Sequence, residues 1–206
     1  MKKSVFILLS LFLIYTTIVC CIPCVTLADR QIIQAVQALL KDVPLSIPML
    51  AGGKLYYLFT LLPMLIGGIF FFRKKQFKDF FLFITAPYIA YFFNCIVKII
   101  IQRPRPPFEL QIAVHKTSFS YPSNHTFVTC FFWGLIIFYL NKYCQNRILK
   151  VLGIGFSVFW IAFSGFCRVW IGVHNPTDVL AGYFLAGIML FVCIKSFVNN
   201  LPENKS

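Results

Sequence analysis

Six long apolar runs divide this sequence and limit what it can fold into. They cover residues 5–27, 55–72, 80–101, 123–140, 148–167 and 179–198. Each is close to the roughly 20 residues that a helix needs to cross the hydrocarbon core of a bilayer. The runs are continuous rather than alternating, which argues against strands. The sequence therefore predicts an all-α, polytopic membrane protein, a six-helix transmembrane bundle that forms one membrane-embedded domain over residues 1–206.

The composition supports this prediction. The chain is 59% hydrophobic and only 12% charged, more apolar surface than a soluble fold of 206 residues could bury. Its formal net charge of +13 raises the question of a nucleic-acid partner. The cations lie mainly in short connections between apolar runs, so membrane topology explains them and no nucleic-acid partner is expected. Nothing in the sequence indicates an oligomeric state.

The first apolar run can be interpreted as a signal peptide or as a retained helix. It follows Met1-Lys2-Lys3 and spans about 23 residues, against roughly 7–15 for the core of a signal peptide. We therefore predict a retained first helix. Cys21 and Cys24 have the spacing of a redox motif, but no βαβ pattern surrounds them. A disulfide between these two cysteines is the alternative if that end of the helix faces an oxidising compartment.

Loop charges predict the orientation in the membrane. Basic residues precede the first run and fill the connections at 73–78 and 142–150. The positive-inside rule places these segments, and both termini, in the cytoplasm of a bacterium whose cytoplasmic (inner) membrane holds the chain. The other connections then face the periplasm or exterior. In one of them, residues 31–43 repeat apolar side chains at helical spacing. This pattern predicts an amphipathic helix on the membrane surface, which either covers the bundle end or borders a lipid entrance.

The outward-facing side also carries cations, which the positive-inside rule does not predict. Arg103, Arg105 and Lys116 lie in the third connection, Arg168 begins the fifth, and Lys98 lies within the third apolar run. A cation inside or beside the hydrocarbon is costly unless it is used. These cations need an anionic partner, and a phosphate group would supply one.

Three segments, at 98–106, 121–125 and 167–178, hold the residues that phosphate-ester cleavage requires. The reaction needs positive donors around the phosphoryl oxygens, an in-line nucleophile and an acid for the leaving oxygen. Lys98, Arg105 and Arg168 can serve as donors. His125 and His174 can serve as acid and nucleophile.

Two helix starts fall in the same segments. Ser123 is a candidate N-cap, with His125 in the first turn, where backbone N–H groups favour a bound anion. Asn175 is a second candidate N-cap, with Pro176 at the first helical position. Asp178 follows in that first turn. It either orients the histidine four residues earlier or only completes a capping box with Asn175.

Taken together, the three segments resemble the signature of the type-2 phosphatidic acid phosphatase superfamily. That signature reads Lys-x6-Arg-Pro, then Pro-Ser-Gly-His, then Ser-Arg-x5-His-x3-Asp. Two positions depart from it, because Asn124 replaces the glycine and Cys167 replaces the serine. The resemblance covers about residues 80–198, and the matching residues are Lys98, Arg105, Pro106, Pro122, Ser123, His125, Arg168, His174 and Asp178.

The resemblance implies a metal-independent, two-step reaction without a cofactor. In that reaction His174 attacks phosphorus and forms a phosphohistidine, Asp178 supports it, and His125 protonates the leaving group. Water then releases phosphate. The phosphoryl oxygens would be held by Lys98, Arg105, Ser123 and Arg168. Asn124, which departs from the signature, brings an amide donor to the same phosphate-binding set.

The resemblance also implies a lipid phosphate or pyrophosphate as substrate. The short chain and outward site favour undecaprenyl pyrophosphate, with phosphatidylglycerophosphate, phosphatidic acid and lipid A as alternatives. Arg103 either belongs to a stiff connector or points with Arg105 to a second phosphate, since residues two apart in an extended segment face the same way. A phosphotransferase and a vanadate-dependent oxidase are variants within the superfamily. A lipid-phosphate binder or transporter without turnover is the alternative from another class.

Overall fold

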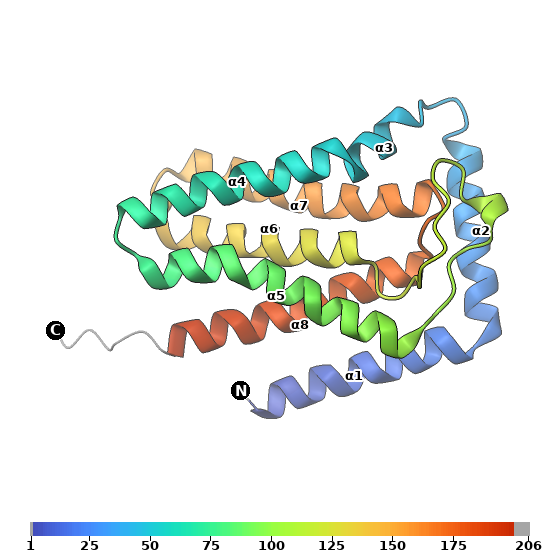
Figure 1. Cartoon of the computed structure of the whole chain (residues 1–206), viewed down its shortest axis with the longest axis horizontal. Helices are drawn as coiled ribbons and strands as arrows, with labels where there is room; N and C mark the ends of the chain where they lie inside the picture. Colours follow the sequence, from blue (N-terminus) through green and yellow to red (C-terminus); the bar gives the residue numbers. More distant parts are fainter. Residues whose placement is uncertain (1, 200–206) are drawn as a thin grey trace.

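The computed structural model describes residues 2–199, and over these residues the chain contains helices and no strands. Six helical segments are long and apolar enough to cross a membrane, which confirms the predicted bundle. The long helices run alongside one another, and α2 crosses one end of them (Figure 1). The elements are α1 (Lys2–Cys21), α2 (Pro23–Leu39), α3 (Ser46–Gly52), α4 (Lys54–Arg73), α5 (Phe77–Ile101), the 3-10 helix η1 (Phe108–Leu110), α6 (Asn124–Tyr143), α7 (Arg147–Trp170) and α8 (Pro176–Asn199).

The first apolar run is broken at Pro23. Ile22 has φ −100° and ψ 109°, the extended conformation that is favoured before a proline. Pro23 then opens α2, where its missing N–H costs nothing. The first span therefore ends at Cys21, earlier than the apolar run does. Cys21 and Cys24 are both free and exposed, so this structure does not join them.

α2 is the amphipathic helix that was expected over 31–43, but it begins earlier and ends at Leu39. It packs against α7 and α8 and buries Asp29 and Ile33. The Gln37 side chain donates hydrogen bonds of 2.7 and 3.0 Å to backbone carbonyl groups at the ends of η1 and α7. The helix therefore covers the bundle end, one of the two roles that the sequence left open.

α6 lies at the centre of the bundle and packs against α5, α7 and α8. Its buried residues include Phe127, Phe131, Phe132 and Leu135. α6 is therefore apolar on nearly every face, as a helix surrounded by other helices is expected to be.

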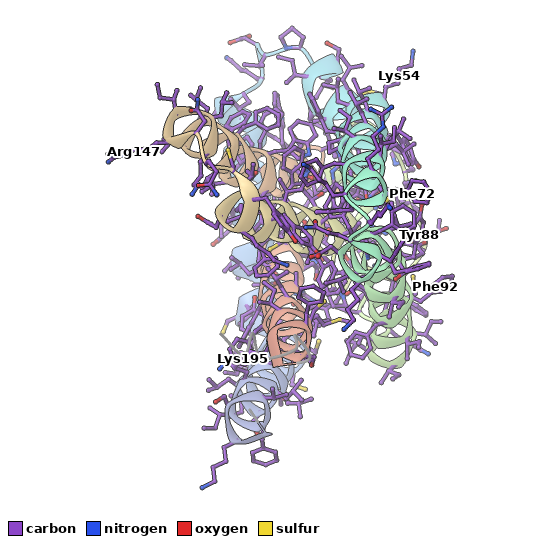
Figure 2. All side chains as sticks on the ribbon, turned by 90° about the vertical axis from the view of Figure 1, so that its left-hand side faces the viewer. Lys54, Phe72, Tyr88, Phe92, Arg147 and Lys195 are labelled. Carbon is purple, nitrogen blue, oxygen red and sulfur yellow. The ribbon has the colours of Figure 1, made fainter. Side chains whose placement is uncertain are left out.

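The outer surface of the bundle is apolar as well. Phe72, Tyr88 and Phe92 point away from the helices in Figure 2, and they are 60%, 52% and 65% exposed. Lipid would cover side chains in these positions. The many phenylalanines of the chain therefore divide between the core and the lipid-facing surface.

The end opposite α2 gathers the start of α1, the end of α8, and the α4–α5 and α6–α7 connections (Figure 1). This is the grouping that the loop charges predicted. A buried carboxylate, Asp79, links two of these segments. It accepts hydrogen bonds from Lys142 Nζ at 3.1 Å and from the Tyr143 hydroxyl at 3.0 Å.

Candidate active site

The three segments that carry the motif meet at the α2 end of the bundle. The end of α5 and the loop after it bring Lys98 and Arg105, and the first turn of α6 brings His125. The end of α7 and the turn before α8 bring Arg168 and His174. All five side chains line one cavity of about 660 Å³. Residues from distant parts of the chain thus form a single cationic site with two histidines.

The same cavity continues between α4 and α5, where its lining becomes aromatic and apolar. Tyr57 and Tyr88 lie on its lipid-facing side and are 62% and 52% exposed. The cavity is therefore cationic at one end and suited to an apolar chain along its length. Its α4 and α5 lining includes Tyr56, Tyr57, Thr60, Leu61, Met64, Pro87, Tyr88 and Tyr91.

A tight turn between α7 and α8 places His174. Gly172 has φ +70°, and an added Cβ would lie 1.8 Å from the Leu110 carbonyl oxygen, so only glycine fits there. His174 itself is 3% exposed. Its Nε2 lies 3.2 Å from Arg105 Nη1, and its Nδ1 lies 3.3 Å from the Ser120 hydroxyl. One ring nitrogen thus faces the cations of the cavity and the other faces the polar groups behind it.

The protonation state of His174 follows from its surroundings. Burial lowers the pKa of His174 to about 3, because the Asp178 carboxylate only partly offsets the desolvation of the charged ring. The imidazole is therefore neutral at neutral pH and carries a lone pair on one nitrogen. With the proton on Nδ1, the lone pair lies on Nε2 and faces the cavity, as nucleophilic attack requires.

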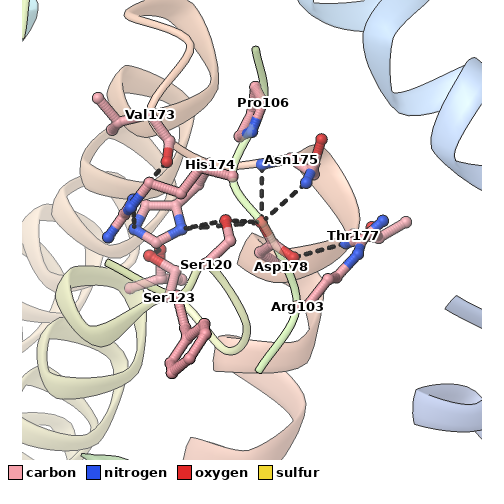
Figure 3. Close-up of polar contacts among 12 residues, drawn as sticks. Arg103, Pro106, Ser120, Ser123, Val173, His174, Asn175, Thr177 and Asp178 are labelled. Atoms are coloured by element: carbon pink, nitrogen blue, oxygen red, sulfur yellow. Dashed lines mark hydrogen bonds and ion pairs between the residues drawn. The ribbon is translucent and has the colours of Figure 1, made fainter. Parts of the chain in front are cut away.

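Asp178 is fully buried behind His174, and Figure 3 shows its contacts. Its Oδ2 lies 3.8 Å from His174 Nδ1 and accepts hydrogen bonds from the Ser120 hydroxyl at 2.5 Å and from the Asn175 backbone N–H at 2.8 Å. The carboxylate thus accepts from the Asn175 backbone N–H, as in a capping box, and the same oxygen also faces the histidine ring. Ser120, which bridges the two, was not predicted, because no local motif marks it.

Lys98 and Arg105 are held by backbone carbonyl groups. Lys98 Nζ donates to the carbonyl oxygens of Phe119 and Ser120 at 2.9 and 3.1 Å. Arg105 donates from Nε to the Ser118 carbonyl oxygen at 2.8 Å and from Nη1 to that of Val173 at 2.5 Å. These bonds fix the direction of both side chains without neutralising either charge.

Arg168 enters the cavity beside α3. Its Nη2 donates to the Pro48 carbonyl oxygen at 3.0 Å, and its Nε is buried with no hydrogen-bond partner among residues 2–199. A Cβ on Gly52 would lie 1.6 Å from Arg168 Nη2, so glycine is needed there for the guanidinium to fit. A buried, unsatisfied donor is costly, and a bound anion would satisfy it.

His125 lines the cavity from the second residue of α6, and its ring centroid lies 4.6 Å from that of Tyr56. The two histidines therefore reach the same space from different segments, His125 from α6 and His174 from the turn before α8. An acid and a nucleophile that act on one phosphorus atom must both reach a shared space of this kind.

Ser123 and Asn124 lie at the start of α6. Ser123 occupies the predicted cap position, but its hydroxyl accepts from Thr126 at 3.0 Å instead of capping the helix, and the side chain is fully buried and does not line the cavity. The Asn124 side chain is bonded to Asn94 and Cys95 on α5. The Asn124 amide thus contacts α5, and the residue also lines the cavity.

Arg103 lies apart from the other cations of the motif. It is 6% exposed, and its guanidinium donates to Asp178 Oδ1 at 2.5 Å and to Asp29 Oδ2 at 2.9 Å. The sequence suggested that Arg103 meets a second phosphate. In the structure its donors are already occupied by two carboxylates, and it does not line the cavity. Asp29, its partner on α2, was not predicted as a site residue.

The side chains around the cavity suit an anion. Among residues 2–199, no group of three or more His, Cys, Asp or Glu side chains is placed to hold a metal ion. The charged groups that line the cavity are Lys98, Arg105, Lys116 and Arg168. Such a donor set can bind and orient phosphoryl oxygens.

Comparison with known proteins decides the family. A family model described as the PAP2 superfamily matches residues 79–202. The chain belongs to this superfamily. It is 32% identical over 196 residues to phosphatidylglycerophosphatase B of Bacillus subtilis (strain 168), which covers 91% of this chain and 93% of that protein. The crystal structure of a transmembrane PAP2-type phosphatidylglycerolphosphate phosphatase from Bacillus subtilis matches with a TM-score of 0.77 at 27% identity, covering 98% of both chains.

The protein is thus a multi-pass membrane phosphatase of the PAP2 superfamily, as the resemblance predicted. Its two departures from the PAP2 pattern are local. Cys167 is fully buried in an apolar cluster with Trp133 and Trp160 and does not line the cavity. Asn124 starts α6 without the positive φ that would require a glycine. Neither departure removes a cation or a histidine from the PAP2 site.

Proposed function

We propose that this protein hydrolyses the terminal phosphate of a membrane lipid, and that phosphatidylglycerophosphate is its main substrate. The observation that carries the proposal is the cavity itself, where the neutral His174 ring faces cations that have no carboxylate partner. The names of the Bacillus subtilis matches, one by sequence and one by structure, support phosphatidylglycerophosphate over the other lipids.

The first step forms a covalent intermediate. His174 Nε2 attacks phosphorus, the bond from phosphorus to the ester oxygen breaks, and the leaving oxygen takes a proton from His125. Lys98, Arg105 and Arg168 bind the phosphoryl oxygens as their charge changes in the transition state. Asp178 stabilises the histidine as it becomes positive.

The second step restores the enzyme. A water molecule attacks the phosphohistidine, the phosphorus–nitrogen bond breaks, and His125 takes the proton that the water loses. The products are the lipid alcohol and inorganic phosphate. The proton that His125 gives to the leaving oxygen in the first step returns to it in the second. The proposed two-step reaction therefore uses no metal ion and no cofactor.

The lipid chains would lie between α4 and α5. The tyrosine-lined part of the cavity starts beside His125 and Arg168 and reaches the exposed face of Tyr57 and Tyr88. Tyrosine suits this position, because its ring is apolar and its hydroxyl can bond a glycerol or phosphate oxygen. A lipid could thus enter sideways without leaving the membrane.

A second phosphate would meet Lys116. This residue lines the cavity from the α5–α6 loop and is exposed, unlike Arg103. Phosphatidylglycerophosphate and undecaprenyl pyrophosphate both carry two phosphates, whereas phosphatidic acid carries one. Undecaprenyl pyrophosphate, which the sequence favoured, therefore stays the second candidate. Replacing Lys116 with alanine should raise KM for both two-phosphate lipids and leave KM for phosphatidic acid unchanged.

The orientation in the membrane belongs to the same proposal. The basic α4–α5 and α6–α7 connections lie at the end opposite the cavity. The positive-inside rule then places that end, with both termini, in the cytoplasm of a bacterial inner membrane and the active site on the outer side.

Phosphate release from purified protein in detergent, with a chelator present, tests the proposal. Phosphatidylglycerophosphate, undecaprenyl pyrophosphate, phosphatidic acid and lipid A would be compared in parallel. We expect release that is fastest with phosphatidylglycerophosphate and inhibited by vanadate. Binding of all four lipids without release would instead support a binder or transporter, and activity that requires vanadate would support an oxidase.

A further inference from the structure

An unexpected acidic residue lies beneath the site. Asp29 belongs to α2, the helix that crosses the bundle end, yet it is only 1% exposed. Its carboxylate accepts from Arg103 Nη2 at 2.9 Å, from the Thr177 backbone N–H at 3.1 Å and from the Thr177 hydroxyl at 2.6 Å. The superfamily signature contains none of these contacts, and the two hydrolytic steps do not use Asp29.

Arg103 joins this carboxylate to Asp178. One nitrogen of its guanidinium, Nη2, binds Asp29, and the other, Nη1, binds Asp178 Oδ1 at 2.5 Å and the Thr177 hydroxyl at 2.8 Å. The carboxylates of Asp178 and Asp29 raise the pKa of Arg103 despite its burial. A permanent positive charge thus lies between two buried negative charges.

This arrangement accounts for both oxygens of Asp178. Oδ1 binds Arg103, and Oδ2 binds Ser120 and faces His174 Nδ1 (Figure 3). A carboxylate bonded on both oxygens cannot rotate freely, and the guanidinium favours its ionised form. Without Arg103, two buried carboxylates would face each other across Thr177, and one of them would take up a proton.

We propose that Arg103 and Asp29 are positioning residues, which hold Asp178 ionised and aimed at His174. The inference rests on the proposed function, because it assumes that His174 is the nucleophile. The proposal gives α2 a role in catalysis. That helix supplies Asp29, the first of four side chains that contact one another in the order Asp29, Arg103, Asp178 and His174.

The alternative is that the ion pairs only fasten α2 to the bundle. The two roles differ in what they predict. A fastening role changes stability and leaves the chemistry of the folded enzyme as it was. A positioning role changes kcat, because phosphorus is attacked by a histidine that Asp178 must support, and it changes the acid side of the pH profile. KM should change little, because the cavity cations are untouched.

The pH profile depends on every charged or titratable group around Asp178. These groups come from five parts of the structure. A shift in the pH profile after one substitution must therefore be compared with the pH profiles of the other single variants. The groups are Tyr15 and Cys20 on α1, Asp29 on α2, Lys98 on α5, Arg103 and Arg105 in the following loop, and His174 before α8.

The test compares Arg103→Gln, Asp29→Asn, Arg103→Lys and the double variant Arg103→Gln/Asp29→Asn. We expect Arg103→Gln to lower kcat by about 10²-fold with KM within about twofold, and to move the acid limb of kcat to higher pH. Asp29→Asn should lower kcat by about threefold to tenfold. Arg103→Lys should retain part of the activity, since it keeps the charge.

The double variant is the most informative. It removes one of the two facing carboxylates, so Asp178 no longer has a buried negative neighbour. We expect it to recover part of the kcat that Arg103→Gln loses. If the contacts only fasten α2, the double variant should be no better than the single one, because it breaks more of them.

A matched control lies at the other end of the bundle. Asp79→Asn removes a buried carboxylate that is paired with Lys142 at 3.1 Å and lies in the first turn of α5, which begins at the end of the bundle opposite α2. Thermal unfolding in detergent would be recorded for every variant. We expect Asp79→Asn to lower stability and keep kcat and the pH profile.

The outcomes separate the two proposals. A wild-type enzyme that releases no phosphate from any lipid overturns the proposed function. An active wild type whose Asp29 and Arg103 variants are folded and keep kcat and the pH profile overturns this inference alone. If Arg103→Gln does not fold, Asp29→Asn and Arg103→Lys carry the same test, and unchanged kcat in both overturns it.

Discussion

Two arginines that lie two residues apart, the buried Arg103 and the half-buried Arg105, carry their charge in opposite ways. Arg103 is paired with two carboxylates, which raise its pKa. Arg105 is held by carbonyl groups, and its burial lowers its pKa. A compensated cation needs no further partner and serves to position its neighbours. An uncompensated one is stable only if an anion arrives, so it marks where substrate binds.

The same contrast separates the two ends of the molecule. At the end opposite α2, Lys142 is paired with Asp79. In the cavity, none of Lys98, Arg105 and Arg168 has a carboxylate within ion-pair distance among the described residues. The cavity end thus holds a net positive charge that the rest of the protein does not neutralise.

The largest effect should come from the nucleophile that these cations face. His174→Ala should lower kcat by about 10⁴-fold or more, because no other group can form the covalent intermediate. His115→Ala is the matched control, since His115 is an exposed loop residue that packs on Phe108 and does not line the cavity. Phosphate release measures both, and unchanged release by His174→Ala would discard the assignment of the nucleophile.

The uncompensated cations come next. Arg105→Gln and Arg168→Gln should each lower kcat/KM by about 10²- to 10³-fold, the usual loss when one donor to a transition-state oxygen is removed. Arg30→Gln, on the exposed side of α2, is the control and should stay within about twofold. Equal losses for all three would mean that net charge matters and that position in the cavity does not.

A smaller effect tests whether the position of Arg168 matters. Gly52→Ala would place a Cβ 1.6 Å from the Arg168 guanidinium and force it to move. We expect kcat/KM to fall by about tenfold, because a small displacement weakens a phosphate contact without abolishing it. Gly155→Ala is the matched control, since nothing lies within 4 Å of its Cβ position. A Gly52→Ala enzyme with the kcat/KM of the wild type would show that Arg168 tolerates displacement.

The burial of His174 makes a prediction about stability. Its folded pKa of about 3 lies below the ordinary value of 6.5, so between these values the unfolded chain binds a proton that the folded protein does not. Stability should therefore fall as the pH drops below 6.5. Near pH 5 the loss from this residue is about 2 kcal/mol. Thermal unfolding of wild type and His174→Asn measures it, and the variant should lose less stability on acidification.

The sequence predicted the parts of this site that depend on local patterns. The membrane-spanning helices can be recognised in the sequence as long apolar runs, because a bilayer needs a fixed helix length. Lys98 and Arg168 stood out because cations near hydrocarbon are costly. The family signature then assigned roles to His125 and His174 by spacing alone.

The sequence could not predict the contacts that depend on long-range packing. Asp29 meets Thr177 across 148 residues, and Ser120 meets Asp178 across 58. Arg103 and Arg105 were expected to point the same way along an extended segment. They instead contact opposite members of the catalytic pair, Asp178 and His174, because long side chains turn toward the charges available to them.

The stereochemistry at phosphorus tests the central claim most directly. A lipid that carries an isotopically chiral thiophosphate ester would be hydrolysed in isotopically labelled water, and the configuration of the released thiophosphate determined. Attack by His174 followed by attack of water inverts phosphorus twice, so the account predicts overall retention. Overall inversion would contradict it, because water would then have attacked the lipid phosphate directly and His174 would form no covalent intermediate.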